Sequence, residues 1–264
     1  MRTHILGLLF SLFLVSCQQN STQEKETIKA EEVQQEPTKP EETEIWEPKP
    51  KTVSVDPKTK IPSDAIVLFD GTNFKEWVSS KDSTAVKWTL NKDGSTTVKD
   101  KTGDIQTKRN FGSIQLHIEW RSSSEIRADG QGRSNSGIFL QNRYEVQVLD
   151  NNDNDTYVNG QAGSIYKQSA PLVKALSKTG DWNTYDIIYH KPIFDSKGNV
   201  SKHGTITVLH NGVLIQDHFK IKGTTEYLGW PKNKPHGKAP IKLQDHQDKS
   251  GVSYRNIWVR ELDD

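Results

Sequence analysis

Residues 144–150 read Tyr144-Glu145-Val146-Gln147-Val148-Leu149-Asp150 and set the pattern of the fold. Side chains of a β-strand point alternately to its two faces, so Val146 and Val148 share one face while Glu145 and Gln147 share the other. A second run also places two polar groups, a carboxamide and an imidazole, on one face; it reads Leu243-Gln244-Asp245-His246. These stretches predict strands with a polar face that contacts a ligand.

The same two-residue period recurs along most of the chain. β-Branched and aromatic residues occur in runs bounded by Gly, Asn, Asp and Pro, as in strands joined by turns. The predicted strands are Ile66–Phe69, Ser113–Trp120, Ser136–Leu140, Tyr144–Leu149, Trp182–His190, Thr205–Leu209, Val213–Ile215, Ile241–Gln244 and Val252–Glu261. The Asn211-Gly212 pair predicts a hairpin turn, and only Pro171–Lys178 has the pattern of a short helix. Many antiparallel strands without helical crossovers predict an all-β sandwich or jelly roll.

The N-terminus resembles a bacterial lipoprotein signal. Arg2 and His4 precede an apolar stretch over residues 5–15, about half of the roughly 20 residues that a membrane-spanning helix needs. The stretch ends in a lipobox-like Leu14-Val15-Ser16-Cys17, and Cys17 is the only cysteine. We expect residues 1–17 to be a signal peptide and Cys17 to be lipidated, which leaves no disulfides. The alternative is a signal that is uncleaved or independent of the cysteine.

Residues 18–60 have the composition of a disordered tether. Gln, Glu, Lys, Thr and Pro dominate, and Trp46 is the only aromatic residue there. Residues 61–264 have the length of a single domain and are predicted to be the catalytic or binding domain. The net charge is +1 with basic residues spread along the chain, which argues against a nucleic-acid partner. We expect a lipid-anchored domain in a bacterial cell envelope, facing the periplasm or the cell surface.

A third run, residues 116–121, also alternates. Leu116, Ile118 and Trp120 are predicted to pack inward, and the opposite face then carries His117, Glu119 and Arg121. Taken alone, such a face is usually a solvated strand surface. Together with the two earlier runs, it predicts that five polar residues converge on one concave sheet: Glu119, Glu145, Gln147, Gln244 and His246.

A series of short motifs follows in order along residues 61–264. They are Leu68-Phe69-Asp70-Gly71 with Trp77, Glu119-Trp120-Arg121, Asn135-Ser136-Gly137-Ile138-Phe139-Leu140, Tyr144 to Asp150, Ala162-Gly163-Ser164-Ile165-Tyr166, Trp182-Asn183-Thr184-Tyr185, Asn211-Gly212, Leu243 to His246 and Arg255-Asn256-Ile257-Trp258-Val259-Arg260. The series resembles the 3-keto-disaccharide hydrolase family, formerly a domain of unknown function. The resemblance implies a concanavalin A-like jelly-roll sandwich of two antiparallel sheets.

The resemblance also implies chemistry on glycosides that are already oxidised at C3, in which members act as lyases, hydratases or net hydrolases. A ketone at C3 acidifies the C2 proton, so a base can remove it, and the enolate then expels the C1 substituent by β-elimination. This chemistry needs a general base, and a cation, metal or hydrogen-bond donor for the enolate oxygen.

The candidate residues divide by what their side chains can do. The base and the acid are expected among Glu145, Glu119 and His246. Groups that orient the substrate or donate hydrogen bonds are expected among Gln147, Gln244 and Asn135. The developing charge is expected to be stabilised by Arg143 or Arg121.

The resemblance further implies a divalent metal of unspecified identity, with Glu145 and His246 as candidate ligands. Residues 150–155 alternate Asp and Asn, whose oxygens suit calcium, but the stretch lacks the glycine and the distal glutamate of an EF-hand loop. A polar connection after the preceding strand is the favoured interpretation. The stretch also departs from many family members, which carry a histidine-containing segment here.

Two other functions remain open. Laminarinase-like glycosidases carry a Glu-x-Asp-x-x-Glu strand, but here the second position is Gln147, which cannot titrate, and the third is the shorter Asp150. A surface lectin would hold sugar on the polar sheet without reacting with it, using Trp230 or Tyr166 as an aromatic platform. For Trp230 taken alone, a packed loop anchor is the favoured interpretation.

Overall fold

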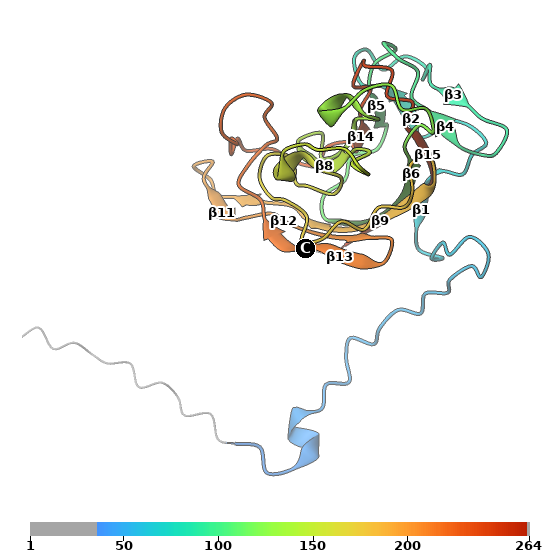
Figure 1. The fold of residues 1–264 in the computed structure, drawn as a ribbon. Helices are drawn as coiled ribbons and strands as arrows, with labels where there is room; N and C mark the ends of the chain where they lie inside the picture. Colours follow the sequence, from blue (N-terminus) through green and yellow to red (C-terminus); the bar gives the residue numbers. More distant parts are fainter. Residues whose placement is uncertain (1–35, 263–264) are drawn as a thin grey trace, which may run out of the picture. The chain divides into compact units, whose positions relative to one another are not determined.

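The computed structural model describes residues 36–262 of the chain (Figure 1). The chain divides into two units, Met1–Lys51 and Thr52–Asp264. In the first unit, the described residues form one short 3₁₀ helix, η1 (Pro40–Thr43), and are exposed. The predicted signal peptide with Cys17, and residues 18–35 of the predicted tether, lie outside the described residues. Between residues 36 and 262, no helix is long and apolar enough to cross a membrane.

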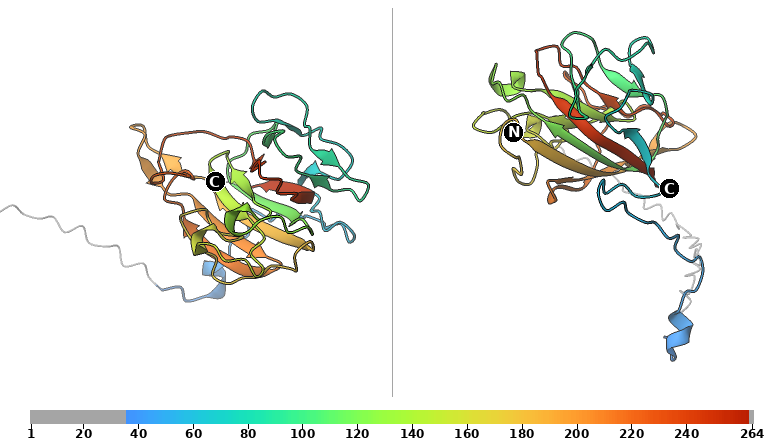
Figure 2. Two further views of the ribbon diagram at one scale, coloured as in Figure 1. Left: turned by 45° about the horizontal axis from the view of Figure 1, so that its top comes forward. Right: turned by 90° about the vertical axis from the view of Figure 1, so that its right-hand side faces the viewer.

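Most strands of the second unit form one eight-stranded antiparallel sheet. They are β1 (Ile66–Phe69), β3 (Thr89–Leu90), β4 (Thr96–Thr97), β6 (Ile114–Arg121), β9 (Trp182–His190), β12 (Thr205–His210), β13 (Val213–Lys220) and β15 (Ser253–Glu261). The order is β13-β12-β9-β6-β15-β4-β3. β4 pairs with residues 253–254 of β15, and β1 pairs with residues 257–259 of the same strand. Figure 2 shows β9, β6 and β15 side by side in gold, green and red.

A five-stranded antiparallel sheet carries the polar strands. It contains β2 (Trp77–Ser79), β5 (Ile105–Thr107), β7 (Ser136–Leu140), β8 (Tyr144–Val148) and β14 (Lys242–Leu243), in the order β2-β5-β14-β7-β8. A small hairpin, β10 (Ile193–Phe194) with β11 (Val200–Lys202), and two 3₁₀ turns, η2 (Gly130–Gly132) and η3 (Val158–Gly160), complete the unit. The predicted all-β jelly-roll sandwich of two antiparallel sheets is confirmed.

One hydrophobic core lies between the two sheets. Leu116, Ile118 and Trp120 of β6 and Val146 and Val148 of β8 are all buried in the same cluster. The alternation read from the sequence is therefore confirmed for both strands. Because these apolar side chains face inward, the polar side chains between them project from the outer face of their own sheet.

The predicted helix over residues 171–178 does not form. The backbone groups that a helix would need are bonded elsewhere: the Leu172 amide donates to Ile215 O, and Ala175 O accepts from the Asn211 side chain. The Ser177 amide likewise donates to the side chain of Asn183. The segment runs as bends beside β13 because tertiary contacts outcompete the local helix pattern.

The edge of β8 is covered by a loop instead of another strand. The Gln147 amide donates to Ser164 O at 3.0 Å, and the Gly163 amide donates to Gln147 O at 2.9 Å. The Tyr166 amide donates to Glu145 O at 3.2 Å. This cover satisfies the free backbone groups of an edge strand and brings Tyr166 next to the polar face of β8.

Candidate functional site

A cavity of about 640 Å³ lies over the outer face of the five-stranded sheet. It is lined by Gln131, Asn135, Phe139, Glu145, Gln147, Tyr157, Tyr166, Lys167, Thr225, Tyr227, Gln244 and His246. Six residues predicted from the sequence are therefore brought together: Asn135, Glu145, Gln147, Tyr166, Gln244 and His246. We call this space the central cavity.

The strand register explains why these residues meet. Within β8, Glu145 and Gln147 are two residues apart and so point to the same side. On β7, Gly137 lies opposite Gln147, and its carbonyl accepts from the amide of Gln244 at 3.1 Å. Gln244 and His246 follow β14, the next strand of the sheet, so their side chains reach the same cavity.

Glu145 is the buried acid of the cavity. Only 4% of the Glu145 surface is exposed. Burial raises the pKa of this carboxyl to about 8, opposed by the charge of Lys242 and reinforced by that of Asp104. Gly137 provides the room, since a Cβ there would lie within 2.9 Å of the Glu145 carboxyl carbon.

Carboxamide groups surround this acid. The Gln147 Nε2 donates to Gln131 Oε1 at 3.1 Å and to Asn135 Oδ1 at 3.3 Å. Asn135 is held in turn by its bond to the Gln131 carbonyl at 2.7 Å. Within the described part of the chain, Gln147 Oε1 and Gln244 Oε1 are buried with no hydrogen-bond partner. Such orphaned acceptors are costly unless a ligand or ion meets them.

His246 lies at the exposed side of the cavity. Its Nδ1 is 2.8 Å from Asp248 Oδ2, and its side chain is 38% exposed. The Asp248 contact fixes the orientation of the imidazole and leaves Nε2 to contact a ligand. His246 is therefore positioned for proton transfer or for metal binding.

Loop residues form an aromatic wall, and of these only Tyr166 was predicted from the sequence. The Tyr157 and Tyr166 hydroxyl oxygens are 2.7 Å apart. The Lys167 Nζ donates to Tyr227 O at 2.6 Å and lies 4.6 Å from the centre of the Tyr227 ring. These residues come from irregular segments, where no strand or helix period marks them.

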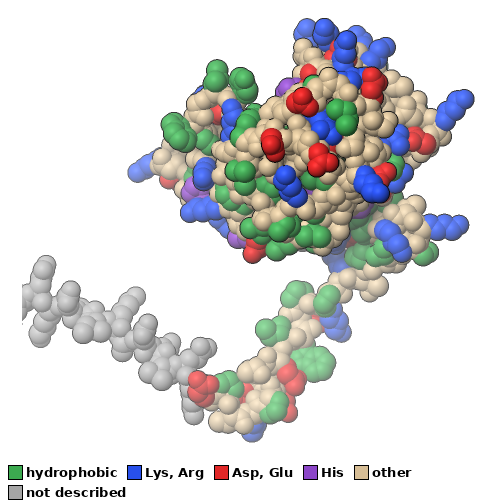
Figure 3. Space-filling view, viewed as in Figure 1, with side chains coloured by type: hydrophobic (Ala, Val, Ile, Leu, Met, Phe, Trp, Pro, Cys, Tyr) green, Lys and Arg blue, Asp and Glu red, His purple; other side chains and the backbone are tan. Residues whose placement is uncertain are grey.

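A second cavity of about 390 Å³ shares Tyr157, Tyr166 and Lys167 with the central cavity. Trp230 lines it and is 88% exposed, so the favoured interpretation of Trp230 as a packed loop anchor is wrong. Its neighbours Tyr227 and Leu228 are 74% and 78% exposed. In Figure 3, hydrophobic side chains gather on the projecting connection between β13 and β14.

The expectation that Glu119 and Arg121 join the other site residues is wrong. Both belong to β6 of the eight-stranded sheet, whose alternate residues fill the core. Their side chains therefore lie on the opposite outer face of the sandwich from Glu145. Arg121 pairs there with Asp93 at 3.2 Å and stacks over Trp182 at 4.6 Å.

Glu119 is part of a satisfied ionic network. Its carboxylate accepts from Arg255 Nε at 2.6 Å and from Asn256 Nδ2 at 2.9 Å. Burial opposes ionisation, but hydrogen bonds from His117, Asn256 and Arg255 lower the pKa of Glu119 to about 2. His117 Nδ1 is bonded to Asp186 at 2.7 Å, and although burial opposes protonation, Asp186 and Glu119 raise the His117 pKa to about 9. The network braces β6 against β9 and β15.

Arg143 does not line the central cavity either. It lies in a neighbouring cavity of about 410 Å³ that shares Phe139 and Thr225 with the central one. Arg143 lies in the tight turn between β7 and β8, so its side chain is placed in this neighbouring cavity and not with Glu145, where the sequence predicted it to stabilise charge.

In the stretch of alternating Asp and Asn, the side chains of Asp150 and Asn154 are occupied by protein partners. Asp150 accepts from Arg133 Nε at 3.1 Å and from Thr179 Oγ1 at 2.8 Å. Asn154 bonds to both backbone groups of Gly130. The polar-connection interpretation fits these contacts, and no group of three or more His, Cys, Asp or Glu residues that could hold a metal is found among residues 36–262.

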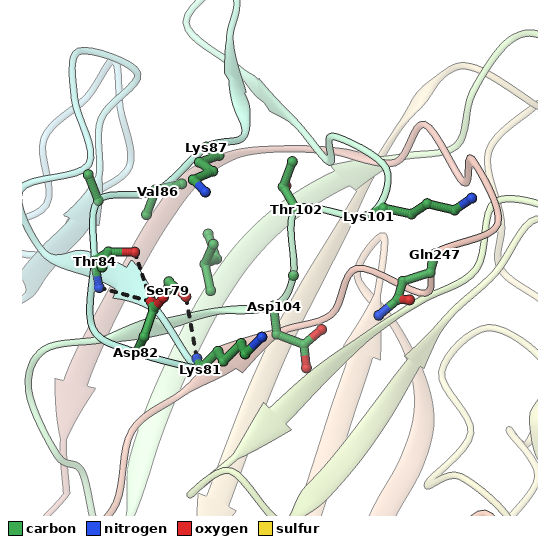
Figure 4. A pocket seen from close by; sticks show the side chains of 13 residues that line it. Ser79, Lys81, Asp82, Thr84, Val86, Lys87, Lys101, Thr102, Asp104 and Gln247 are labelled. Atoms are coloured by element: carbon green, nitrogen blue, oxygen red, sulfur yellow. Dashed lines mark hydrogen bonds between the residues drawn. The ribbon is translucent and has the colours of Figure 1, made fainter.

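A separate cavity of about 340 Å³ lies by the loops after β2 and before β5 (Figure 4). Asp82 caps its own turn by accepting from Thr84, and Lys81 extends toward Asp104. Lys87 and Gln247 also line this space. Its polar groups belong to surface turns, and it contains none of the predicted site residues.

Residues 64–260 match the model of a family described as the 3-keto-alpha-glucoside-1,2-lyase-like domain. The chain belongs to this family. The resemblance inferred from the sequence motifs is confirmed, and the protein is a member of a carbohydrate-active family. A comparison with curated proteins found no match.

Solved structures from Parabacteroides distasonis ATCC 8503 agree with this assignment. One, described as a candidate glycosyl hydrolase, is 52% identical, covers 85% of this chain and 97% of its own, and has a TM-score of 0.81. Two others with the same description are 20% and 21% identical, with TM-scores of 0.56 and 0.52. They cover 80% and 75% of this chain and 99% of their own, and they show the fold of this 3-keto-glucoside lyase-like domain.

Proposed function

We propose that the protein acts on 3-keto-glycosides by removing the C2 proton and eliminating the C1 substituent. One observation carries the proposal: among the described residues that line the central cavity, Glu145 alone has a carboxyl group. Ordinary glycoside hydrolysis uses a pair of carboxyl groups across the bond. A single buried carboxylate with neighbouring donors suits proton abstraction next to a ketone instead.

Glu145 is the proposed general base. Its carboxylate takes the C2 proton, and the C2–H electrons form the enolate of the C3 ketone. The raised pKa makes this carboxylate a stronger base than an exposed glutamate. Hydrogen-bond donors of Gln244 and His246 are proposed to stabilise the enolate oxygen, while Gln147 and Asn135 orient the ring.

The C1 substituent then leaves. The C1–O bond breaks as the enolate collapses, which gives a 1,2-unsaturated 3-keto sugar, and the departing oxygen must gain a proton. The Tyr157–Tyr166 pair borders both cavities, and burial raises the pKa of the Tyr166 hydroxyl, so it stays protonated and donates a hydrogen bond to the departing oxygen. The proton that Glu145 took from C2 then passes to that oxygen, which returns Glu145 to its carboxylate form. Addition of water to the unsaturated product would complete a net hydrolysis. The second cavity, with Trp230, would hold the departing group.

A divalent metal fits the residues of the central cavity. The orphaned oxygens of Gln147 and Gln244, the Glu145 carboxylate and the His246 Nε2 form a mixed oxygen and nitrogen donor set. These four side chains would hold the ion, and with the ion bound His246 would act as a ligand instead of as a donor to the enolate oxygen. When bound, the metal would act as a Lewis acid on the C3 carbonyl oxygen.

The proposed location rests on the N-terminal residues. The short apolar stretch that ends at Cys17 supports the proposal that the protein is lipid-anchored in a bacterial cell envelope. The composition of residues 18–60 supports a tether that would let the domain reach glycosides away from the lipid.

The test is turnover of matched substrates. The full chain is incubated with a 3-keto-glucoside and with the unoxidised glucoside, with and without a chelator, and the products are followed by mass spectrometry. Consumption of the keto compound alone supports the proposal, and its loss with chelator supports the metal. Binding of sugar without turnover would favour a lectin, and cleavage of the plain glucoside would favour a glycosidase.

A further inference from the structure

The cavity that holds Arg143 has a composition unlike that of the central cavity. Of its lining residues, Arg143, Lys232, Lys234 and Lys242 are cationic and only Glu226 is acidic. The whole chain carries a net charge of +1, so this is a local concentration of positive charge. Like charges gathered around a concave space raise the local concentration of anions. We call this space the basic cavity.

The Arg143 side chain is held in place. Gln141 and Asn142 take left-handed backbone conformations, with φ of 49° and 56°, which closes the tight turn between β7 and β8. The Arg143 amide donates to Leu140 O at 3.0 Å, and its carbonyl accepts from the Thr225 amide at 2.8 Å. Its Nη1 donates to Gln141 O at 2.8 Å. One nitrogen thus anchors the guanidinium, and the remaining donors can bind a ligand.

The lysines differ in how far they are neutralised. Lys242 forms an ion pair with Asp104 at 2.8 Å and lies 4.0 Å from the centre of the Phe139 ring. The Lys232 Nζ is 3.6 Å from Glu226 Oε2, which is long for an ion pair. Lys234 and Lys232 are exposed at the rim. After these pairings, the cavity still presents an excess of donors that carry positive charge.

The basic cavity adjoins the space where the sugar is proposed to lie. Phe139 and Thr225 line both cavities, so the two spaces lie next to each other. We propose that the basic cavity binds an anionic substituent, a carboxylate or a sulfate ester, of the glycoside whose ring occupies the central cavity. Arginine matches the paired oxygens of such groups with two parallel hydrogen bonds. The inference relies on the proposed function only for the position of the sugar.

Calorimetry on the full chain tests the inference without requiring turnover. The probes are methyl α-glucoside, methyl α-glucuronide, which carries a carboxylate at C6, and methyl α-glucoside 6-sulfate. At low salt, at least one anionic probe should bind about tenfold or more tightly than the neutral one. A preference for the carboxylate or for the sulfate identifies the anion, and equal binding of all three overturns the inference.

Variants locate the effect. Arg143→Gln and Lys234→Gln should each reduce the preference for the anionic probe and leave binding of the neutral probe unchanged. Lys87→Gln is the matched control, because Lys87 is an exposed lysine of the separate cavity in Figure 4. An equal loss in Lys87→Gln would overturn the inference by showing only a general charge effect. Absence of keto-glycoside turnover would contradict the proposed function but not this binding preference.

Discussion

The carboxyl group of Glu145 lies directly over Gly137 of the neighbouring strand. A Cβ on Gly137 would come within 2.9 Å of the Glu145 carboxyl carbon and 2.7 Å of Phe139 Cε2. The backbone of Gly137 does not have a positive φ, so glycine is required by this close approach and not by conformation. The missing side chain leaves the space that the Glu145 carboxyl group occupies.

Gly137→Ala should therefore displace the proposed base without unfolding the protein. The added methyl group meets the Glu145 carboxyl and the Phe139 ring, so both must shift, and the melting temperature should fall by several degrees while the domain stays folded. Turnover of a 3-keto-glucoside should fall by about tenfold or more, because small displacements of a catalytic group are costly. Gly237→Ala is the control, since a Cβ there meets nothing within 4 Å. Unchanged kinetics in Gly137→Ala would argue against Glu145 as the base.

The pH dependence of turnover reports the ionisation of Glu145. Its pKa of about 8 means that the carboxylate form grows as pH rises toward 8. If Glu145 is the base, kcat/KM should increase about tenfold per pH unit below this value and level off above it. A profile that falls as pH rises through 8 would instead identify Glu145 as an acid.

Glu119 should matter for stability and not for turnover. Glu119→Gln removes a carboxylate whose folded pKa is lowered from 4.5 to about 2. The stabilising contribution of the Glu119 carboxylate is present above the unfolded-state pKa of 4.5. It is lost as pH falls through the folded-state pKa of about 2. The variant should lose about 1–3 kcal/mol of unfolding free energy at pH 7 and progressively less in acid. Denaturant unfolding measures this loss, and a loss of turnover in the folded variant would contradict the placement of Glu119.

Trp230 should affect substrates according to the size of their C1 substituent. Trp230→Ala should raise KM about three- to tenfold for a phenyl 3-keto-glucoside, because ring stacking is lost. KM for the methyl compound should stay unchanged. Trp46→Ala is a matched control, since Trp46 is also exposed, at 75%, and lines neither cavity. Equal effects on both substrates would show that the second cavity does not hold the departing group.

The sequence predicted the sandwich well because alternation is a local signal. β1, β7 and β9 have the predicted bounds, and Glu145 and Gln147 share a face as expected. Alternation also placed Glu119 away from the core, but it cannot tell which sheet a strand joins. A two-residue alternation looks the same whichever outer face of the sandwich carries the polar side chains. Glu119 was therefore assigned to the wrong outer face.

Other parts of the fold and of the site depend on contacts between residues that are far apart in the sequence. The short strands β2 and β5 pair with each other and have too few residues to show a period. Tyr157, Lys167 and Tyr227 lie in loops that meet only after folding. An exposed aromatic residue in a polar loop is the one signal that could have marked them. The failure of the predicted helix at residues 171–178 has the same origin, since its backbone bonds to residues far along the chain.

The most direct test of the account is the turnover of Glu145→Gln. Single-turnover rates with a 3-keto-glucoside are compared with wild type, and binding of the unoxidised glucoside is measured on the same samples. We predict a loss of about 10²- to 10⁴-fold in rate with the folded state and sugar binding preserved, because the isosteric amide cannot accept the C2 proton. A rate close to that of wild type would contradict Glu145 as the base and with it the proposed elimination.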